Sequence, residues 1–446
     1  MNRDLTKGSV LKSMLLFSIP MILGDLLQQC YNIVDTLIVG QFLGKNALAS
    51  VGSSFTLMTF ITSIILGLCM GSGALFSIRY GQKDEKGLRE DVCASFFFIA
   101  LITFILTVIS YIFLNQLSVF LHVPHEVWGD MKGYLIVIFI GIPAIFLYNY
   151  FASYLRAIGN SMIPLIFLAI SAILNIGLDL FFVIVLKLGV EGAAIATVIS
   201  QYLSGIGISI YSLIKNIQVR AIMKLQYFHL KRVHKVISFS VLTCIQQSVM
   251  NFGILMIQGL VNSFGKVIMA AFAAAVKIDT LAYMPAQEFA NSYSLFVSQN
   301  FGAKERDRIK EGTKKAMITS VAFCFIISII IVFAADNLMM LFVKSTEIET
   351  IKEGAKYLRI EGSMYIEIGI LFLWYGYFRG INKPLISLIL TIVSLGLRVL
   401  LSYSFAKTTP LGVIAIWCSI PIGWIIADIT GLVLYKKYSK KALENI

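Results

Sequence analysis

The stretch IPLIFLAISAILNIGLDLFFVIVL, residues 163–186, decides the fold class of this chain. It is apolar almost throughout, and a helix of this length crosses a hydrocarbon core of about 30 Å. Similar stretches recur along the 446 residues, of which 58% are hydrophobic and 14% charged, giving a mean hydropathy of +0.84. Because the stretches are continuous and not alternating, the sequence predicts an all-α membrane protein and argues against a transmembrane β-barrel.

Twelve stretches of this kind predict twelve transmembrane helices, so both termini lie on one side of the membrane. The predicted spans cover residues 14–39, 49–77, 92–114, 133–155, 163–186, 189–214, 236–262, 267–299, 316–343, 357–378, 384–406 and 411–435. Most of the 37 Lys and Arg residues lie in the termini and in the loops expected on that same side. The positive-inside rule therefore predicts a multi-pass plasma-membrane protein with both termini in the cytoplasm. The net charge of +13 follows from this topology, so we expect no nucleic-acid partner.

A basic cytoplasmic connector, residues 215–235, divides the chain into an N-terminal lobe, residues 1–218, and a C-terminal lobe, residues 219–446. The lobes are an internal repeat of six spans each. Matches at offsets of 218 to 223 residues join Gly44-Lys45 to Gly265-Lys266, Gln28-Gln29 to Gln246-Gln247, Tyr80-Gly81 to Phe301-Gly302, Arg156 to Arg379, and Gly189-Val190 to Gly412-Val413. Because each repeat has an even number of spans, the lobes share one orientation. The repeat predicts two pseudo-symmetric lobes around a central cleft, a design that secondary transporters use.

Two acidic residues, Asp35 and Asp179, lie inside apolar stretches of the first lobe. A charged side chain at the middle of a membrane helix costs roughly 2.5–3.5 kcal/mol on insertion scales, so such residues usually have a function. By the repeat offsets, Gly253 stands opposite Asp35, and Val399 stands opposite Asp179. The second lobe therefore lacks acids at the matching positions. This asymmetry indicates a cation site in the first lobe and a cation-driven transporter.

Several motifs together make the sequence resemble the multidrug and toxic compound extrusion (MATE) family, with its DinF-like branch the closer match. They are Pro20-Met-Ile-Leu-Gly-Asp-Leu-Leu-Gln28-Gln-Cys-Tyr31-Asn-Ile-Val-Asp35-Thr36, Arg156-Ala-Ile-Gly159-Asn160, Asn175-Ile-Gly-Leu-Asp179, Gly189-Val-Glu-Gly-Ala-Ala-Ile-Ala-Thr197 and Tyr283-Met-Pro-Ala-Gln. The resemblance covers essentially the whole chain. It implies twelve helices in two six-helix lobes and a secondary active antiporter working by alternating access. It also implies export of cationic or amphiphilic organic compounds in exchange for H⁺ or Na⁺.

The resemblance also implies the residues of the coupling site. In the DinF-like branch, the N-terminal lobe binds the cation through an Asp in span 1, an Asn and an Asp in span 5, and a Thr in span 6. These positions are Asp35, Asn175, Asp179 and Thr197 here. Pro20 matches a bend-forming proline of the family, and a proline removes one helix hydrogen bond. Leu395 stands opposite Asn175 in the second lobe, unlike the acidic C-terminal site of the NorM-like branch.

Physical arguments from the residues support the same site without selecting the ion. At about 1.5 Å per residue, all four positions fall in the outer half of their spans. Asn175 and Asp179 are four residues apart and share a helix face. Hard oxygen ligands suit Na⁺, whereas two nearby carboxylates suit a shared proton. The alternative is structural, with Asp35 at the end of its helix and Asp179 hydrogen-bonded to Asn175 in a packed lobe.

Further polar residues within the predicted spans have more open roles. Gln28, Tyr31, Asn149 and Glu288 are expected to line the substrate cleft, with ordinary interhelical hydrogen bonding as the alternative. Lys277 and Asp279 are expected to form a structural pair. Three other intramembrane charges, Glu361, Glu367 and Arg398, are expected to stabilise the second lobe.

Two other functions remain open from the sequence. A lipid-linked oligosaccharide flippase of the same superfamily is an alternative, although it would favour a strongly cationic cavity. A membrane-embedded enzyme is a second alternative, and the sequence shows no intramembrane histidine and no clear nucleophile–base pair. We expect a monomer in the lipid bilayer, with small organic cations or amphiphiles as its cargo. No cofactor is expected, and no metal other than Na⁺ at the coupling site.

Overall fold

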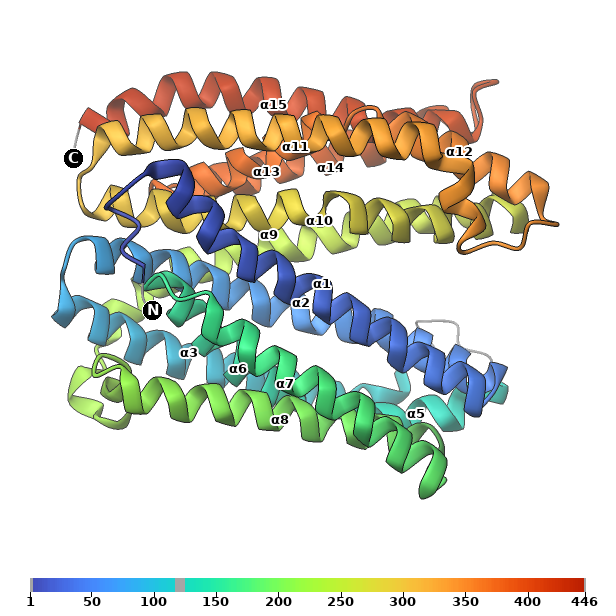
Figure 1. The fold of residues 1–446 in the computed structure, drawn as a ribbon, viewed down its shortest axis with the longest axis horizontal. Helices are drawn as coiled ribbons and strands as arrows, with labels where there is room; N and C mark the ends of the chain where they lie inside the picture. Colours follow the sequence, from blue (N-terminus) through green and yellow to red (C-terminus); the bar gives the residue numbers. More distant parts are fainter. Residues whose placement is uncertain (1–2, 117–124, 445–446) are drawn as a thin grey trace. The chain divides into compact units, whose positions relative to one another are not determined.

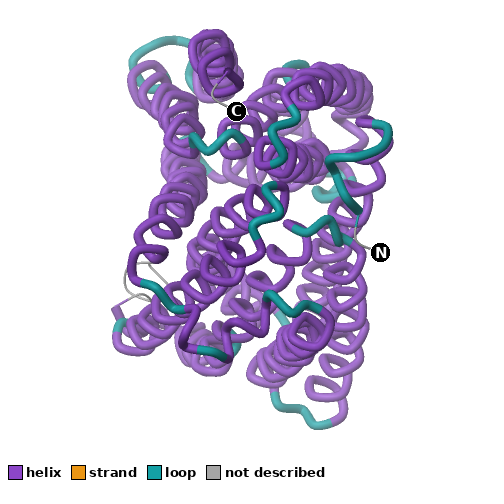
Figure 2. The backbone as a smooth tube through the Cα atoms, turned by 90° about the vertical axis from the view of Figure 1, so that its left-hand side faces the viewer, coloured by secondary structure: helices purple, strands orange, loops and turns teal. Residues whose placement is uncertain are grey.

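A computed structural model describes residues 3–116 and 125–444. Within these ranges the backbone consists of helices and loops, with no strand (Figure 2). The chain divides into two compact units. The N-terminal unit is Met1–Asp4 and Leu23–Cys244, and the C-terminal unit is Leu5–Ile22 and Ile245–Ile446. Both units are built of helices, as the sequence predicted for an all-α membrane protein.

The first half of the chain forms a series of long helices followed by a short connector. The helices are α1 (Val10–Phe42), α2 (Lys45–Gly81), α3 (Glu85–Ile112), α5 (His125–Ile140), α6 (Ile142–Ala157), α7 (Met162–Asp179), the π-helix η1 (Leu180–Val185) and α8 (Gly189–Lys215). The connector contains the two 3₁₀ turns η2 (Val219–Met223) and η3 (Leu225–Tyr227). Inside the N-terminal unit, α6 packs along α8 and against α2 (Figure 1).

The second half repeats this series. Its helices are α9 (Leu230–Asn262), α10 (Lys266–Gly302), α11 (Arg306–Met340), α12 (Ile348–Gly362), α13 (Tyr365–Gly380), α14 (Pro384–Phe405) and α15 (Val413–Glu444). Inside the C-terminal unit, α10 packs along α13, and α14 packs along α15 (Figure 1). The first two helices of each half have matching lengths, with 33 residues in α1 and α9 and 37 in α2 and α10. The proposed division at residues 218 and 219 follows this repeat, whereas the boundaries of the compact units fall inside α1 and α9.

Backbone conformation shows the repeat independently of side chains. Positive φ angles occur at Lys83 (56°) and Lys304 (64°), and at Gly44 (87°) and Gly265 (102°), each pair 221 residues apart. Gly189 (63°) and Gly412 (54°) form a third pair, 223 residues apart. The left-handed region is costly for residues other than glycine, so its use by Lys83 and Lys304 marks the same helix-to-helix turn in both halves.

The number of membrane-length helices differs in detail from the twelve predicted spans. Among the described residues, ten helices are long and apolar enough to cross a membrane. An eleventh span arises if α5 and α6, which are bent by 43° at their junction, are taken together. The predicted span 357–378 falls on α12 and α13, which have 15 and 16 residues and are separated at Ser363 and Met364. Apolar periodicity alone does not reveal where such a helix breaks.

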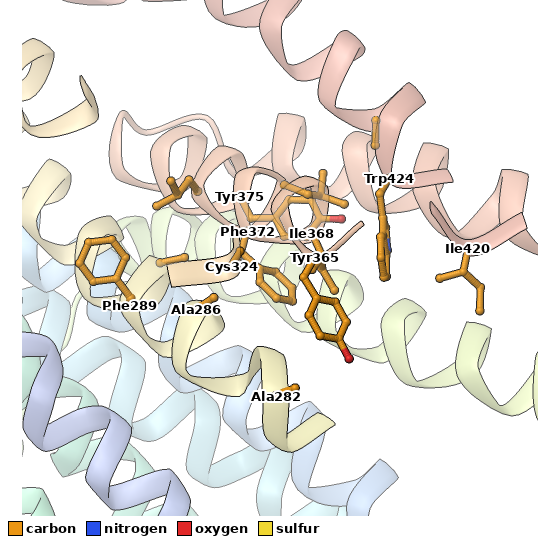
Figure 3. Close-up of a cluster of buried hydrophobic side chains, with 14 of the residues drawn as sticks. Ala282, Ala286, Phe289, Cys324, Tyr365, Ile368, Phe372, Tyr375, Ile420 and Trp424 are labelled. Carbon is orange, nitrogen blue, oxygen red and sulfur yellow. The ribbon is translucent and has the colours of Figure 1, made fainter. Parts of the chain in front are cut away.

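Each unit has its own hydrophobic core. In the N-terminal unit, Phe76, Phe139, Tyr150 and Tyr154 are buried together. In the C-terminal unit the core joins α10, α11, α13 and α15. Figure 3 shows part of it, with Phe289 from α10 and Tyr365 and Phe372 from α13. These cores fix the helices that carry the polar residues described below.

Close packing of α9 against α2 in the N-terminal unit depends on glycine. A Cβ atom on Gly71 would lie 2.5 Å from the carbonyl oxygen of Phe239, and one on Gly67 would lie 2.6 Å from Cα of Cys244. At the same place the hydroxyls of Ser72 and Ser240 are 2.8 Å apart. Small residues of this kind let helix backbones approach closely inside a membrane.

We predict that Gly71→Ala lowers the free energy of unfolding by about 1–3 kcal/mol, because the added methyl group overpacks the contact with α9. Thermal unfolding of the purified protein in detergent measures the change. Gly52→Ala, on the same helix, is the matched control, because no described heavy atom outside the helix's own backbone lies within 4 Å of a Cβ atom placed on Gly52. It should leave the unfolding temperature unchanged or slightly raised. Equal unfolding temperatures for the two variants would contradict the close-packing account.

Candidate functional site

The structure brings the four expected coupling residues together within the N-terminal unit. Asp35 lies on the second half of α1, Asn175 and Asp179 on the last turn of α7, and Thr197 on α8. The Asn175 amide nitrogen donates to the Thr197 hydroxyl at 3.3 Å. The carboxyl groups of Asp35 and Asp179 lie within hydrogen-bonding reach of each other. Asn175 and Asp179 are 2% and 0% exposed, and Asp35 is half-buried.

The oxygen atoms of this cluster face one another with few donors. Among the described residues, no donor reaches Oδ1 of Asp35, Oδ1 of Asn175 or either carboxyl oxygen of Asp179. Ionised carboxylates only accept hydrogen bonds, so Asp35 and Asp179 can share one only when a proton lies between them. Buried acceptors without a donor are rare in proteins and call for a ligand or a functional role. The cluster therefore suits a proton or a small cation.

Local helix geometry places Asp179 at a change of register. The α-helix α7 ends at Asp179, and the π-helix Leu180–Val185 continues directly from it. Short π-helical turns are rare and often occur at functional sites. Asn175 and Asp179 both lie within the α-helix, as their four-residue spacing predicted. The helical turn widens only after Asp179.

Two tyrosines accompany the acidic pair. Tyr31 precedes Asp35 by one turn of α1, and both Tyr31 and Tyr134 of α5 lie close enough to Asp35 and Asp179 to interact with them electrostatically. Tyr134 is 7% exposed. Sequence reasoning named Tyr31 for the substrate cleft but missed Tyr134, because a tyrosine inside an apolar helix carries no signal of its own.

The matching positions of the C-terminal unit also meet in space, although they are apolar. A Cβ atom on Gly253 would lie 3.2 Å from Cδ2 of Leu395. These residues correspond to Asp35 and Asn175 in the repeat. The same scaffold therefore brings both pairs of positions together, and only the N-terminal unit has oxygen ligands there.

The residues expected to line a substrate cleft have varied surroundings. Gln28 is exposed, Tyr31 is half-buried, and Asn149 donates to the Ile145 carbonyl of its own helix at 2.9 Å. Pro20 is buried within α1, which continues on both sides of it.

Glu288, in the C-terminal unit, belongs to a buried polar chain. It is 8% exposed and accepts from the Asn291 amide at 2.7 Å. The Asn291 carbonyl oxygen is 3.5 Å from the guanidinium of Arg379, which is 6% exposed. Glu288 therefore already has a hydrogen-bond partner within its own unit.

Buried acids of the C-terminal unit have partners that the sequence did not indicate. Asp279 was expected to pair with Lys277. Instead, Lys277 is exposed, and Asp279 accepts from the Tyr365 hydroxyl at 2.7 Å. The Tyr357 hydroxyl is 2.8 Å from Glu361 and 3.4 Å from Asp279.

Glu367 and Asp428 form a second acidic pair in this unit. Their carboxyl groups lie within hydrogen-bonding reach of each other. Sequence reasoning missed Asp428, although an isolated acid in the apolar stretch 413–435 is the same kind of signal that identified Asp35. Arg398 lies close enough to Asp279 and Glu361 to interact with them electrostatically.

The fold and the buried polar clusters define a two-lobed helical membrane transporter. The family model MatE matches residues 20–181 and 241–404, one segment in each half of the repeat. The chain therefore belongs to the MATE family of multidrug efflux transporters and is not an enzyme.

Individual relatives agree with this assignment. The probable multidrug resistance protein YpnP of Bacillus subtilis is 28% identical over 400 residues, covering 88% of this chain and 87% of the relative. The probable multidrug resistance protein YoeA of the same organism is 26% identical, with coverage of 95% and 92%. The solved structure of an outward-facing multidrug resistance MATE family transporter of the MOP superfamily superimposes with a TM-score of 0.92 at 22% identity. It covers 98% of each chain and shows the shared fold.

The apolar counterpart positions lead to a stability prediction. We predict that Asp35→Ala, Asn175→Leu and Asp179→Val combined do not lower the unfolding temperature, because removing buried unpaired acceptors together is often neutral or stabilising. Asp279→Leu should cost about 1–3 kcal/mol, because it leaves the buried Tyr365 hydroxyl without its acceptor. Differential scanning fluorimetry in detergent compares the two. An equal loss of stability in both would contradict the distinction between the clusters.

Proposed function

We propose that this transporter is a secondary active antiporter. It exports cationic or amphiphilic organic compounds in exchange for H⁺ or Na⁺. It works by alternating access, in which the transport site opens in turn to the two sides of the membrane. The observation that carries the proposal is the group of Asp35, Asp179 and Asn175 oxygens, which are buried without donors inside the N-terminal unit. Membership of a multidrug efflux family supports the export of organic compounds.

The chemistry of exchange follows from the cost of buried charge. Two carboxylates in a low-dielectric interior repel each other, so the site needs a proton or a cation to compensate them. An organic cation that approaches the same carboxylates can compensate their negative charge in place of the proton or Na⁺. Cargo and coupling cation therefore compete for one negative site, which is the thermodynamic requirement for exchange. The gradient of the smaller cation then drives export, because its entry reloads the site and displaces the cargo.

The identity of the coupling ion is the open part of this proposal. Carboxylate, amide and hydroxyl oxygens are ligands that Na⁺ accepts. The contact between the carboxyl groups of Asp35 and Asp179 suits a proton equally. The proposal includes cytoplasmic termini, a plasma-membrane location and a monomer. The flippase and the membrane enzyme have no specific observation in their favour.

We predict that Asp35→Asn and Asp179→Asn each abolish gradient-driven efflux, because a neutral amide cannot exchange charge with a cation. Ethidium efflux from cells or vesicles measures this loss, with size-exclusion chromatography as the test of folding. Asp336→Asn is the matched control, since Asp336 pairs with Arg359 at the exposed surface and such pairs contribute little. Undiminished efflux by both site variants would remove the proposed site.

The coupling ion is identified by reconstituting the protein in proteoliposomes with separately imposed proton and sodium gradients. We predict that at least one inward gradient drives cargo out of the compartment that corresponds to the cytoplasm. The same gradient should fail to drive export by Asp179→Asn. Cargo movement at equal rates with and without either gradient would contradict antiport.

A further inference from the structure

The beginning of α1 and the rest of the same helix belong to different units. Residues Leu5–Ile22 are part of the C-terminal unit, whereas Leu23 onward, including Asp35, is part of the N-terminal unit. The helix continues between them from Val10 to Phe42 (Figure 1). The helix that carries Asp35 is therefore attached at its start to the unit that lacks the site.

Arg308 of α11 holds this starting segment by its main chain. Its guanidinium donates to the carbonyl oxygens of Gly8 at 2.8 Å and of Leu5 and Lys7 at 3.2 Å each. It also donates to the side-chain oxygen of Asn300 at 3.2 Å. A single planar group thus binds four acceptors. A lysine has one nitrogen and cannot span them, so the arrangement needs the fork of arginine.

Other contacts fix the same segment in register. The Leu5 amide donates to Oε1 of Gln299 at 3.0 Å, and the Asn300 amide donates to the Leu5 carbonyl at 3.2 Å. Gln299 and Asn300 are both 0% exposed. Five apolar side chains of the segment are buried in the core of the C-terminal unit, namely Leu5, Val10, Met14, Phe17 and Met21.

The start of α9 has the reciprocal attachment, made by different chemistry. Residues up to Cys244 belong to the N-terminal unit. Arg232 there donates to Glu90 of α3 at 2.7 Å, and its guanidinium is 3.9 Å from the carboxylate of Asp91. Both halves of the repeat therefore hold the first helix of the other half. In the C-terminal unit an arginine of α11 binds main-chain carbonyls of the segment before α1. In the N-terminal unit an arginine of α9 binds a carboxylate of α3.

We propose that Arg308 is a positioning residue for transport, which ties the start of α1 to the C-terminal unit. A displacement of that unit is then transmitted along α1 to Asp35, and the occupancy of Asp35 acts back along the same helix. The inference rests on the proposed cation site at Asp35. It assigns to Arg308, which lies in the other unit, a role in the rate of transport and none in the binding of cargo.

The first test separates transport rate from cargo binding in proteoliposomes. Arg308→Ala should lower the maximal transport rate about tenfold and leave the equilibrium dissociation constant for ethidium within twofold of the unmodified protein. Arg308→Lys should behave as Arg308→Ala does, because the charge is kept while the fork is lost. Lys310→Ala is the control on the same helix, since Lys310 forms a surface ion pair with Asp307. Full transport rate in Arg308→Ala, or in Arg308→Lys, would overturn the proposal.

The second test asks whether attachment itself is the function of Arg308. Cysteines at positions 5 and 299, joined as a disulfide because both positions are buried, replace the Leu5–Gln299 hydrogen bond by a covalent link. In the Arg308→Ala background, this link should restore at least half of the lost rate, whereas either cysteine alone should not. Hydrogen exchange of residues 5–14 should rise in Arg308→Ala and fall again after linking. A restored attachment without restored transport would overturn the proposal.

A third measurement keeps this inference distinct from the antiport proposal. Exchange of labelled for unlabelled ethidium needs no ion gradient. If the protein is not an antiporter, neither the unmodified protein nor Asp35→Asn responds to an imposed gradient, while Arg308→Ala still slows exchange. If Arg308 has no positioning role, exchange by Arg308→Ala equals that of Lys310→Ala, whatever Asp35→Asn does. If Arg308→Ala does not fold, the same comparisons are made with Arg308→Lys.

Discussion

A carboxyl group in the interior of a membrane protein has to share its charge with a proton, a cation or a hydrogen-bond donor. The Asp35–Asp179 pair is arranged around this constraint. The Asn175 amide donates to the Thr197 hydroxyl, so few protein donors remain for the two carboxyl groups. The α7 helix changes register at Asp179, and two tyrosines lie nearby. The polar interior of the N-terminal unit thus contains buried carboxyl oxygens that few protein donors reach.

The repeat supplies a contrast within the same molecule. Gly253 and Leu395 meet in the C-terminal unit where Asp35 and Asn175 stand in the other, so the scaffold alone does not require charge at this place. The acids of the C-terminal unit lie elsewhere, and Asp279 receives tyrosine hydroxyls. The two halves therefore differ in where their buried acids lie. Among the described residues, acids without donors occur in both halves, since no donor reaches either carboxyl oxygen of Asp428 in the C-terminal unit. Different side chains at a few positions of a repeated scaffold are sufficient to make the halves unequal.

Much of the fold and the candidate site could be predicted from the sequence, because both depend on local patterns. Apolar length gave the helices, the repeat gave two similar halves, and the four-residue spacing of Asn175 and Asp179 gave a common face. Local patterns do not predict packing between segments that are far apart in the sequence. The break between α12 and α13, the partners of Asp279 and the attachment of Leu5 to Gln299 all depend on contacts between segments far apart in the chain. Lys277 shows the risk of pairing charges by sequence distance alone.

The central claim is that cargo and coupling cation share the Asp35–Asp179 site, and release of the cation on cargo binding tests it most directly. Ethidium is added to purified protein in detergent while proton release is followed with a pH indicator and sodium release with ²²Na⁺. The account predicts about one cation released per cargo bound, and none from the Asp35→Asn/Asp179→Asn double variant. Cargo binding without release in the unmodified protein, or equal release by both proteins, would contradict it.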